Sequence, residues 1–150
     1  MAKHYNFSDE LTTLEFARKL AGALQPGHIV LLEGDLGAGK TALAREMIRD
    51  LANNPDLAVP SPTFTLVQTY ETPKMEIWHF DLYRLDDPDE IFELGWEEAL
   101  SGPLVLIEWP DRLGGYRPDN AVEILLKPGS DGPDSRYIRI RNLPDEAQDL

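Results

Sequence analysis

The chain contains no cysteine, and this absence excludes two classes of protein at once. Without thiols it has neither a disulfide framework nor a thiolate metal site. It also lacks any apolar run near the roughly 20 residues of a membrane-spanning helix. Its first residues, MAKHYNFSDE, hold no apolar stretch of the kind found in a secretory signal. We therefore expect a cytoplasmic protein that does not associate with a membrane.

Basic residues are scarce as well. The chain has 14 Lys and Arg against 27 Asp and Glu, which gives a formal net charge of −13. A protein that grips nucleic acid directly usually presents a basic patch to the phosphates. Here the basic residues cluster only in pairs, such as Arg18 and Lys19, or alternate along a strand, as Arg139 and Arg141 do. Acidity often reflects solubility alone, but we expect any action on RNA or DNA to pass through a partner.

The residues that are present fit one domain. A chain of 150 residues, 42% hydrophobic and 27% charged, is typical of a single globular unit with its own core. Apolar residues at helical spacing follow Ser8, which is a plausible N-cap. The predicted elements are a helix at 11–24, a strand at 28–33, a helix at 39–52, extended segments at 63–71 and 75–83, a helix at 86–100 broken near Gly95, a strand at 104–109, a loop at 111–118, and strands at 122–126 and 137–140.

These elements predict a mixed sheet. Aliphatic strands separated by helices are typical of parallel pairing, whereas the short connection at 72–74 and the one at 127–135 indicate antiparallel hairpins. Residues 1–150 are therefore expected to form one α/β domain, with a flexible acidic tail over about 143–150.

Residues 34–41 read GDLGAGKT and match the phosphate-binding pattern G-x-x-x-x-G-K-[ST]. The strand before and the helix after this loop are the context that the pattern requires. The glycines let successive N–H groups face the phosphates of a nucleotide, while Lys40 reaches the β- and γ-phosphates and Thr41 ligates magnesium. The loop predicts a single-domain P-loop NTPase fold with three layers. The residues expected to surround the phosphates are Asp35, Leu36, Gly37, Ala38, Gly39, Lys40 and Thr41.

A P-loop site needs a second carboxylate at the end of a neighbouring strand, to hold magnesium directly or through water. Glu108 and Asp81 are the two candidates. Glu108 follows four aliphatic residues, as in a central strand, whereas Asp81 ends a segment in which polar and apolar residues alternate. This difference favours Glu108 as the metal carboxylate. His79 is a further candidate base, although a strand histidine is more often structural.

The loop Ser61-Pro62-Thr63 lies between the P-loop helix and the next extended segment. This is the position of a switch loop, whose hydroxyls approach the γ-phosphate and its metal. An ordinary proline turn is the alternative.

Five motifs in one order resemble the TsaE family, small bacterial P-loop ATPases that act in the synthesis of threonylcarbamoyladenosine in tRNA. The resemblance spans about residues 8–128, and Asp111 departs from it, since the family more often has Glu there. The motifs are GDLGAGKT, SPTFTLV at 61–67, HFDLYRL at 79–85, ELGWEEAL at 93–100 and IEWPDRL at 107–113.

The resemblance implies a cofactor, partners and residue roles. The cofactors are ATP and Mg²⁺, and the partners are TsaB and TsaD. In that complex TsaD transfers a threonylcarbamoyl group to the adenosine beside the anticodon, and slow ATP hydrolysis supports repeated cycles, so tRNA is contacted only indirectly. The implied catalytic residues are Lys40, Asp81 and Glu108, with Thr41 and Glu108 on magnesium and Asp81 orienting the attacking water. The remaining residues implied to lie near the nucleotide are Thr12, Thr13, Ser61, Thr63, Trp109 and Arg112.

Two other functions use the same loop. A small-molecule P-loop kinase needs an acceptor pocket and usually an arginine-rich lid, yet the loop at 111–118 holds only Arg112 and Arg117. A nucleotide-dependent binding switch, in which hydrolysis is incidental, overlaps with the family's function and stays open at this stage.

Overall fold

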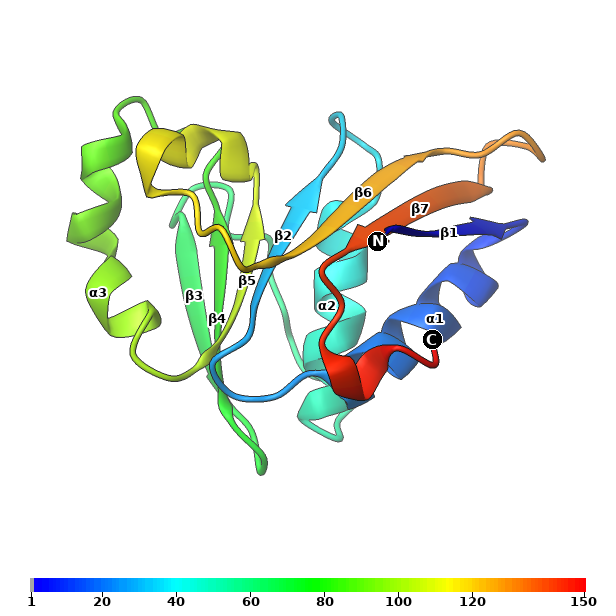
Figure 1. Cartoon of the computed structure of the whole chain (residues 1–150), viewed down its shortest axis with the longest axis horizontal. Coiled ribbons are helices and arrows are strands. Elements are labelled where there is room, and N and C mark those ends of the chain that lie inside the picture. Colours follow the sequence, from blue (N-terminus) through cyan, green and yellow to red (C-terminus); the bar gives the residue numbers. More distant parts are fainter. Residues whose placement is uncertain (1) are drawn as a thin grey trace.

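Seven strands form one mixed sheet in the computed structural model, which describes residues 2–150 apart from the side chain of residue 146 (Figure 1). The strands are β1 (Ala2–Phe7), β2 (Ile29–Glu33), β3 (Val67–Glu71), β4 (Glu76–Asp81), β5 (Leu104–Glu108), β6 (Val122–Pro128) and β7 (Arg136–Arg141). Their order across the sheet is β1-β7-β6-β2-β5-β4-β3.

The centre of the sheet is parallel and its two sides are antiparallel. β2 pairs in parallel with β5 and β6, and β5 pairs in parallel with β4. The antiparallel pairs are β3–β4, β6–β7 and β1–β7. The central strands are aliphatic because both of their faces are covered, and β5 is buried along its whole length. The predicted mixed sheet is confirmed.

Helices lie on both faces of this sheet, which gives three layers (Figure 1). On one face α1 (Glu10–Ala23) packs against α2 (Lys40–Leu51), and the 3-10 helix η3 (Asp145–Ala147) contacts α1. On the other face lie α3 (Trp96–Ala99) and the 3-10 helices η1 (Pro88–Leu94) and η2 (Pro110–Tyr116). Within residues 2–150, no helix combines the length and the apolar character that crossing a bilayer requires.

Each face of the sheet has its own apolar core. Leu20 of α1 and Met47 of α2 are fully buried against the first face. Phe80, Ile91 and Trp96 are buried against the second, where the Phe80 and Trp96 rings meet edge to face at 5.7 Å. Because β4 and β5 are fixed from both sides, the carboxyl ends of these strands are rigid supports for side chains.

Several predicted boundaries are wrong. Asp9, not Ser8, caps α1, because its carboxylate accepts the Thr12 N–H at 2.8 Å. The extended segment predicted from residue 63 begins only at Val67, since the Leu66 N–H donates to the Pro62 carbonyl at 2.7 Å and closes a turn.

The third layer also differs from the prediction. The helix at 86–100 is broken at Gly95 as expected, but its first part is the 3-10 helix η1 and only its last turn is α-helical. The segment predicted as a loop at 111–118 is mostly the 3-10 helix η2. A helix this short and rich in glycine gives no helical period to detect.

Both ends of the chain pack against the first core. β1 is an edge strand that the sequence does not predict, and Tyr5 and Phe7 alternate inward along it. The Tyr5 hydroxyl donates to the Leu150 carbonyl at 2.6 Å, and Ala147 is buried. These contacts give the position of residues 143–150 but do not measure their motion. The flexibility of this segment therefore stays a prediction.

Candidate functional site

The loop between β2 and α2 has the shape of a phosphate-binding loop. Gly39 caps α2 in the left-handed conformation, with φ of 105°, so the backbone turns directly from loop into helix. Gly34 has φ of 151°, and a Cβ there would lie 2.6 Å from the Leu126 carbonyl oxygen. A side chain at residue 34 would therefore push the loop away from β6, which explains why the turn needs glycine.

Lys40 is folded back over this loop. Its ammonium group donates to the carbonyls of Gly34 at 2.6 Å and Asp35 at 2.9 Å, and only 4% of the residue is exposed. The Trp109 ring lies 4.2 Å from the same nitrogen. Trp109 adopts φ of 60°, rare for a bulky residue, which turns the chain sharply at the end of β5. The Lys40 ammonium is thus held between the loop carbonyls and the Trp109 ring.

Two carboxylates lie side by side at the carboxyl end of the parallel strands. Asp81 is the last residue of β4, Glu108 is the last residue of β5, and the two are paired in register. This edge of an open α/β sheet is where ligands bind. Both predicted candidates are therefore brought together beside the P-loop.

The Glu108 carboxylate is held at both oxygens. The Thr41 hydroxyl donates to Oε1 at 2.7 Å, and Nε2 of His79 is 2.7 Å from Oε2. Glu108 is 2% exposed and His79 is fully buried. Because His79 does not line the cavity beside the P-loop, the geometry does not favour it as a base acting on substrate.

The same groups fit a magnesium ion. The Thr41 hydroxyl and the Glu108 carboxylate offer hard oxygen ligands 2.7 Å apart. Among residues 2–150 no three His, Cys, Asp or Glu side chains are grouped to hold a metal by themselves. Magnesium usually binds through one or two protein ligands, substrate phosphates and water, so this pair suits an ion that arrives with a nucleotide.

Asp81 connects this centre to the loop that carries Ser61 and Thr63. The Thr63 hydroxyl donates to one Asp81 oxygen at 3.4 Å, and the Ser61 and Thr63 hydroxyls are 2.7 Å apart. The other Asp81 oxygen accepts the Tyr83 N–H at 3.1 Å. Burial raises the pKa of Asp81, and the nearby Glu108 charge adds to this, against the opposing effect of its hydrogen bonds.

This raised pKa predicts that Asp81→Asn stabilises the fold at neutral pH. Folding favours the protonated acid, so the stability that Asp81 contributes is complete below its unfolded pKa and is lost as pH rises through its folded pKa. The amide removes the cost of the buried charge, and we expect a gain of about 0.5–2 kcal/mol in the free energy of unfolding at pH 7. The gain should vanish below about pH 4.

Urea unfolding at several pH values measures this effect. Asp56→Asn is the matched control, because Asp56 is exposed and lines neither of the cavities beside the P-loop. A loss of stability at pH 7 in Asp81→Asn would contradict the account.

A cavity of about 270 Å³ lies at the junction of these elements. The residues predicted near the nucleotide that do not line it are Thr12, Thr13, Asp35, Ala38 and Arg112. The Arg112 guanidinium lies 5.6 Å from the ring of Tyr83, and the Thr12 hydroxyl donates to Asp9 at 2.9 Å. The residues that line the cavity are Leu36, Gly37, Gly39, Lys40, Thr41, Ala42, Ser61, Thr63, Asp81, Tyr83, Glu108 and Trp109.

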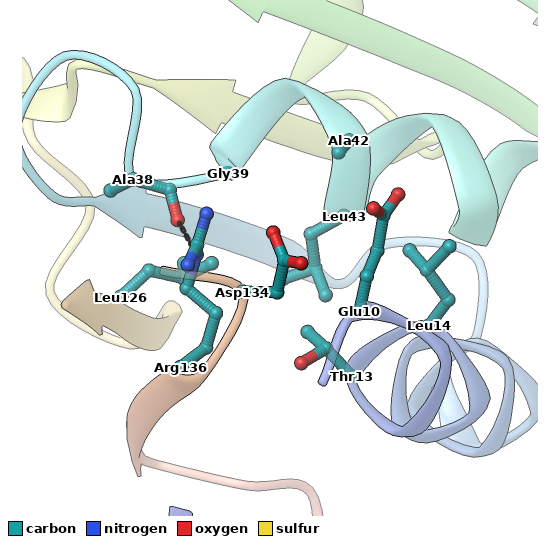
Figure 2. Close-up of a pocket in the computed structure, with 10 residues that line it drawn as sticks. All are labelled: Glu10, Thr13, Leu14, Ala38, Gly39, Ala42, Leu43, Leu126, Asp134 and Arg136. Atoms are coloured by element: carbon teal, nitrogen blue, oxygen red, sulfur yellow. Dashed lines mark hydrogen bonds between the residues drawn. The ribbon is translucent and has the colours of Figure 1, made fainter. Parts of the chain in front are cut away.

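A second cavity, of about 160 Å³, also borders the P-loop (Figure 2). It shares Gly39 and Ala42 with the first cavity. Figure 2 shows the start of α1 facing the start of α2 across it, with Arg136 reaching toward the loop. The Nε of Arg136 donates to the Ala38 carbonyl at 3.0 Å. The lining residues are Glu10, Thr13, Leu14, Ala38, Gly39, Ala42, Leu43, Leu126, Asp134 and Arg136.

Among the α1 and β6–β7 residues of this second cavity, the family resemblance pointed to Thr13 as a residue bordering the base, and it pointed to none of the others. Thr13, Asp134 and Arg136 belong to no phosphate-binding pattern, and they meet only because β7 and α1 fold beside the loop. For the hairpin, the available signal is Arg136, an arginine at the start of a strand in an acidic chain.

Comparison with known proteins supports one family. The family model described as "Threonylcarbamoyl adenosine biosynthesis protein TsaE" matches residues 7–138. A protein of Rickettsia bellii, named tRNA threonylcarbamoyladenosine biosynthesis protein TsaE, is 47% identical over 90% of this chain and 92% of its own length. The protein of that name from Aquifex aeolicus is 32% identical over 93% of this chain and 96% of its own length.

The fold agrees with a solved structure. The crystal structure of YdiB from Bacillus subtilis superposes with a TM-score of 0.74 over 99% of this chain and 90% of that one, at 24% identity. The family model and the relatives confirm the resemblance found from the five sequence motifs. The chain belongs to the TsaE family of threonylcarbamoyladenosine biosynthesis proteins.

Proposed function

We propose that this protein is a slow ATPase that works with TsaB and TsaD, so that TsaD modifies the adenosine beside the tRNA anticodon over many cycles. The observation that carries the proposal is the joint placement of Lys40, Thr41 and Glu108 at the carboxyl end of the parallel strands. A phosphate loop, a hydroxyl and a strand-end carboxylate are the parts that a P-loop NTPase uses to bind a nucleotide with magnesium. The proposed place of action is the cytoplasm.

The two cavities suit the two ends of a nucleotide. The first is lined by residues of the loop and by Lys40, whose N–H groups and ammonium would bind the phosphates. In the second, Leu14, Leu43 and Leu126 offer apolar contact to a base, and Asp134 offers acceptors to an amino group such as that of adenine. Because both cavities border Gly39 and Ala42, one nucleotide can span the loop.

The position of Asp81 supports a role in orienting the attacking water. It lines the first cavity, and burial raises its pKa, which brings it nearer to the range useful for accepting a proton. Ser61 and Thr63 are poised to respond to the γ-phosphate, since their hydroxyls are bonded to each other and Thr63 to Asp81. Bound magnesium would neutralise charge on the phosphates, with Thr41 and Glu108 holding it.

The site lacks one part of a fast ATPase. None of the residues that line the first cavity, all within the described chain, is an arginine. Arg84 lies over the exposed ring of Phe64, 4.5 Å from its centroid, and Arg112 is exposed. An arginine supplied in cis or in trans is worth about 10³–10⁵ in rate in related NTPases. Slow turnover alone and faster turnover in a complex follow from this arrangement.

Phosphate release from ATP, measured with and without TsaB and TsaD, tests the proposal. We expect feeble turnover by the protein alone and a rise of at least about tenfold with the pair, because a partner completes the site. The pair mixed with Lys40→Met is the control for contaminating activity. No stimulation of properly folded protein would contradict the proposal. Labelled phosphate that appears on a small metabolite would instead support the kinase alternative.

A further inference from the structure

His79 is an ionisable residue that the proposed reaction does not use. It lies on β4, is fully buried and does not line either cavity. Its Nε2 is 2.7 Å from Oε2 of Glu108. His79 therefore contacts the carboxylate that is proposed to hold magnesium, and it lines neither cavity in which the nucleotide is proposed to bind.

We propose that His79 is a positioning residue for magnesium, which acts by fixing the carboxylate of Glu108. This inference rests on the proposed function, because that function assigns the magnesium ion to Glu108. With Oε2 held by His79, the other oxygen, Oε1, is directed to the Thr41 hydroxyl at 2.7 Å, where the ion would bind. A carboxylate with one oxygen fixed is presented in one orientation, so less entropy is lost when the ion arrives.

The second ring nitrogen supports this role. Nδ1 of His79 is buried and has no hydrogen-bond partner among the described residues. A buried polar atom without a partner lowers stability. An apolar side chain at residue 79 would avoid that cost among neighbours such as Ile77 and Leu106. The histidine is thus a poor choice for packing alone, and its contact with Glu108 is what it adds.

Two amide substitutions separate the role from packing. In His79→Gln the amide nitrogen stands three bonds from Cβ, as Nε2 does, so it still reaches Glu108. In His79→Asn the amide stands two bonds from Cβ, as Nδ1 does, so the bond to Glu108 is lost. Both variants bury one uncharged amide in the same place. Phe80→Leu is the control for general weakening of β4, because Phe80 packs on the opposite face of the sheet.

The measurement is binding of fluorescent N-methylanthraniloyl-ADP to the full chain, first in EDTA and then during titration with Mg²⁺. Outer-shell partners of metal ligands typically change metal affinity by about 10–100-fold. We expect His79→Asn to need at least about tenfold more Mg²⁺ than the wild type. His79→Gln should stay within about threefold, which is the rescue expected of a retained hydrogen bond. Affinity in EDTA should be the same in all variants.

Equal Mg²⁺ requirements in His79→Asn and His79→Gln would overturn the inference, as would an Mg²⁺ shift of the same size in Phe80→Leu. Affinity that falls equally in EDTA would assign His79 to the shape of the loop and overturn it too. If the wild type binds the nucleotide without any response to Mg²⁺, the proposed function fails along with the inference. If the wild type responds to Mg²⁺ and His79→Asn needs no more Mg²⁺ than the wild type, the inference is rejected and the proposed function stands.

Discussion

Lys40→Met is expected to weaken nucleotide binding by at least about 100-fold and to bring ATP hydrolysis to background, the largest effect of any single change considered for this chain. The ammonium is anchored on two carbonyls of the P-loop and buried beneath Trp109. Its charge is therefore fixed before the phosphates arrive. Methionine keeps the unbranched chain and the contact with the indole but removes the charge.

The fold should tolerate this substitution. Burial lowers the pKa of the Lys40 ammonium, and the Glu108 charge opposes this only in part. Folding thus disfavours the charged amine, and this cost is absent above the amine's unfolded pKa and grows as pH falls through its folded pKa. At neutral pH the charge opposes folding, so Lys40→Met is expected to unfold at the same temperature as the wild type or higher.

Isothermal titration with ATP and Mg²⁺ measures the loss of binding, and a thermal melt checks the fold. Lys19→Ala is the control, since Lys19 is an exposed lysine of α1 and carries the same charge. Binding by Lys40→Met within about threefold of the wild type would mean that the loop does not use its lysine for phosphates.

Glu108→Gln is expected to lower ATP hydrolysis by about 10²–10³ while leaving binding in EDTA unchanged. The amide keeps the volume of the side chain and can still meet Thr41 and His79, but it removes the negative charge that would hold magnesium. The defect should therefore lie in the metal-dependent step. Single-turnover hydrolysis and nucleotide titration, each with and without Mg²⁺, separate the two effects.

The same variant decides between an ATPase and a binding switch. If Glu108→Gln binds ATP but does not hydrolyse it, and tRNA modification with TsaB and TsaD still proceeds through many cycles, then binding alone supports the partners. If modification stops after one cycle, hydrolysis is required. Glu123→Gln is the matched control, because Glu123 of β6 bonds Arg117 at 3.1 Å and does not line the cavity.

Much of the fold follows from local pattern. The runs that form β2 and β5 are aliphatic because covered parallel strands must be, and the P-loop glycines mark the turn between β2 and α2. The edge strand β1 has no comparable pattern, since His4 and Asn6 face solvent and the strand is defined by its pairing with β7. Such a strand depends on a partner more than 100 residues away in the chain.

The site shows the same division between local and distant information. Lys40 and Thr41 are read directly from the loop, and the strand ends indicate Asp81 and Glu108. The register of β4 against β5 decides which residue contacts Glu108. The contact with His79 is therefore visible only in three dimensions. Arg136 reaches Ala38 across 98 residues of chain for the same reason.

The most direct test of the central claim is tRNA threonylcarbamoylation by TsaB and TsaD, followed over many cycles with and without this protein. The proposed role predicts that product stops near one equivalent of TsaD without the protein and continues to accumulate when the protein and ATP are added. It also predicts that Lys40→Met does not restore accumulation. Equal product over many cycles in the presence and absence of the protein would contradict the account.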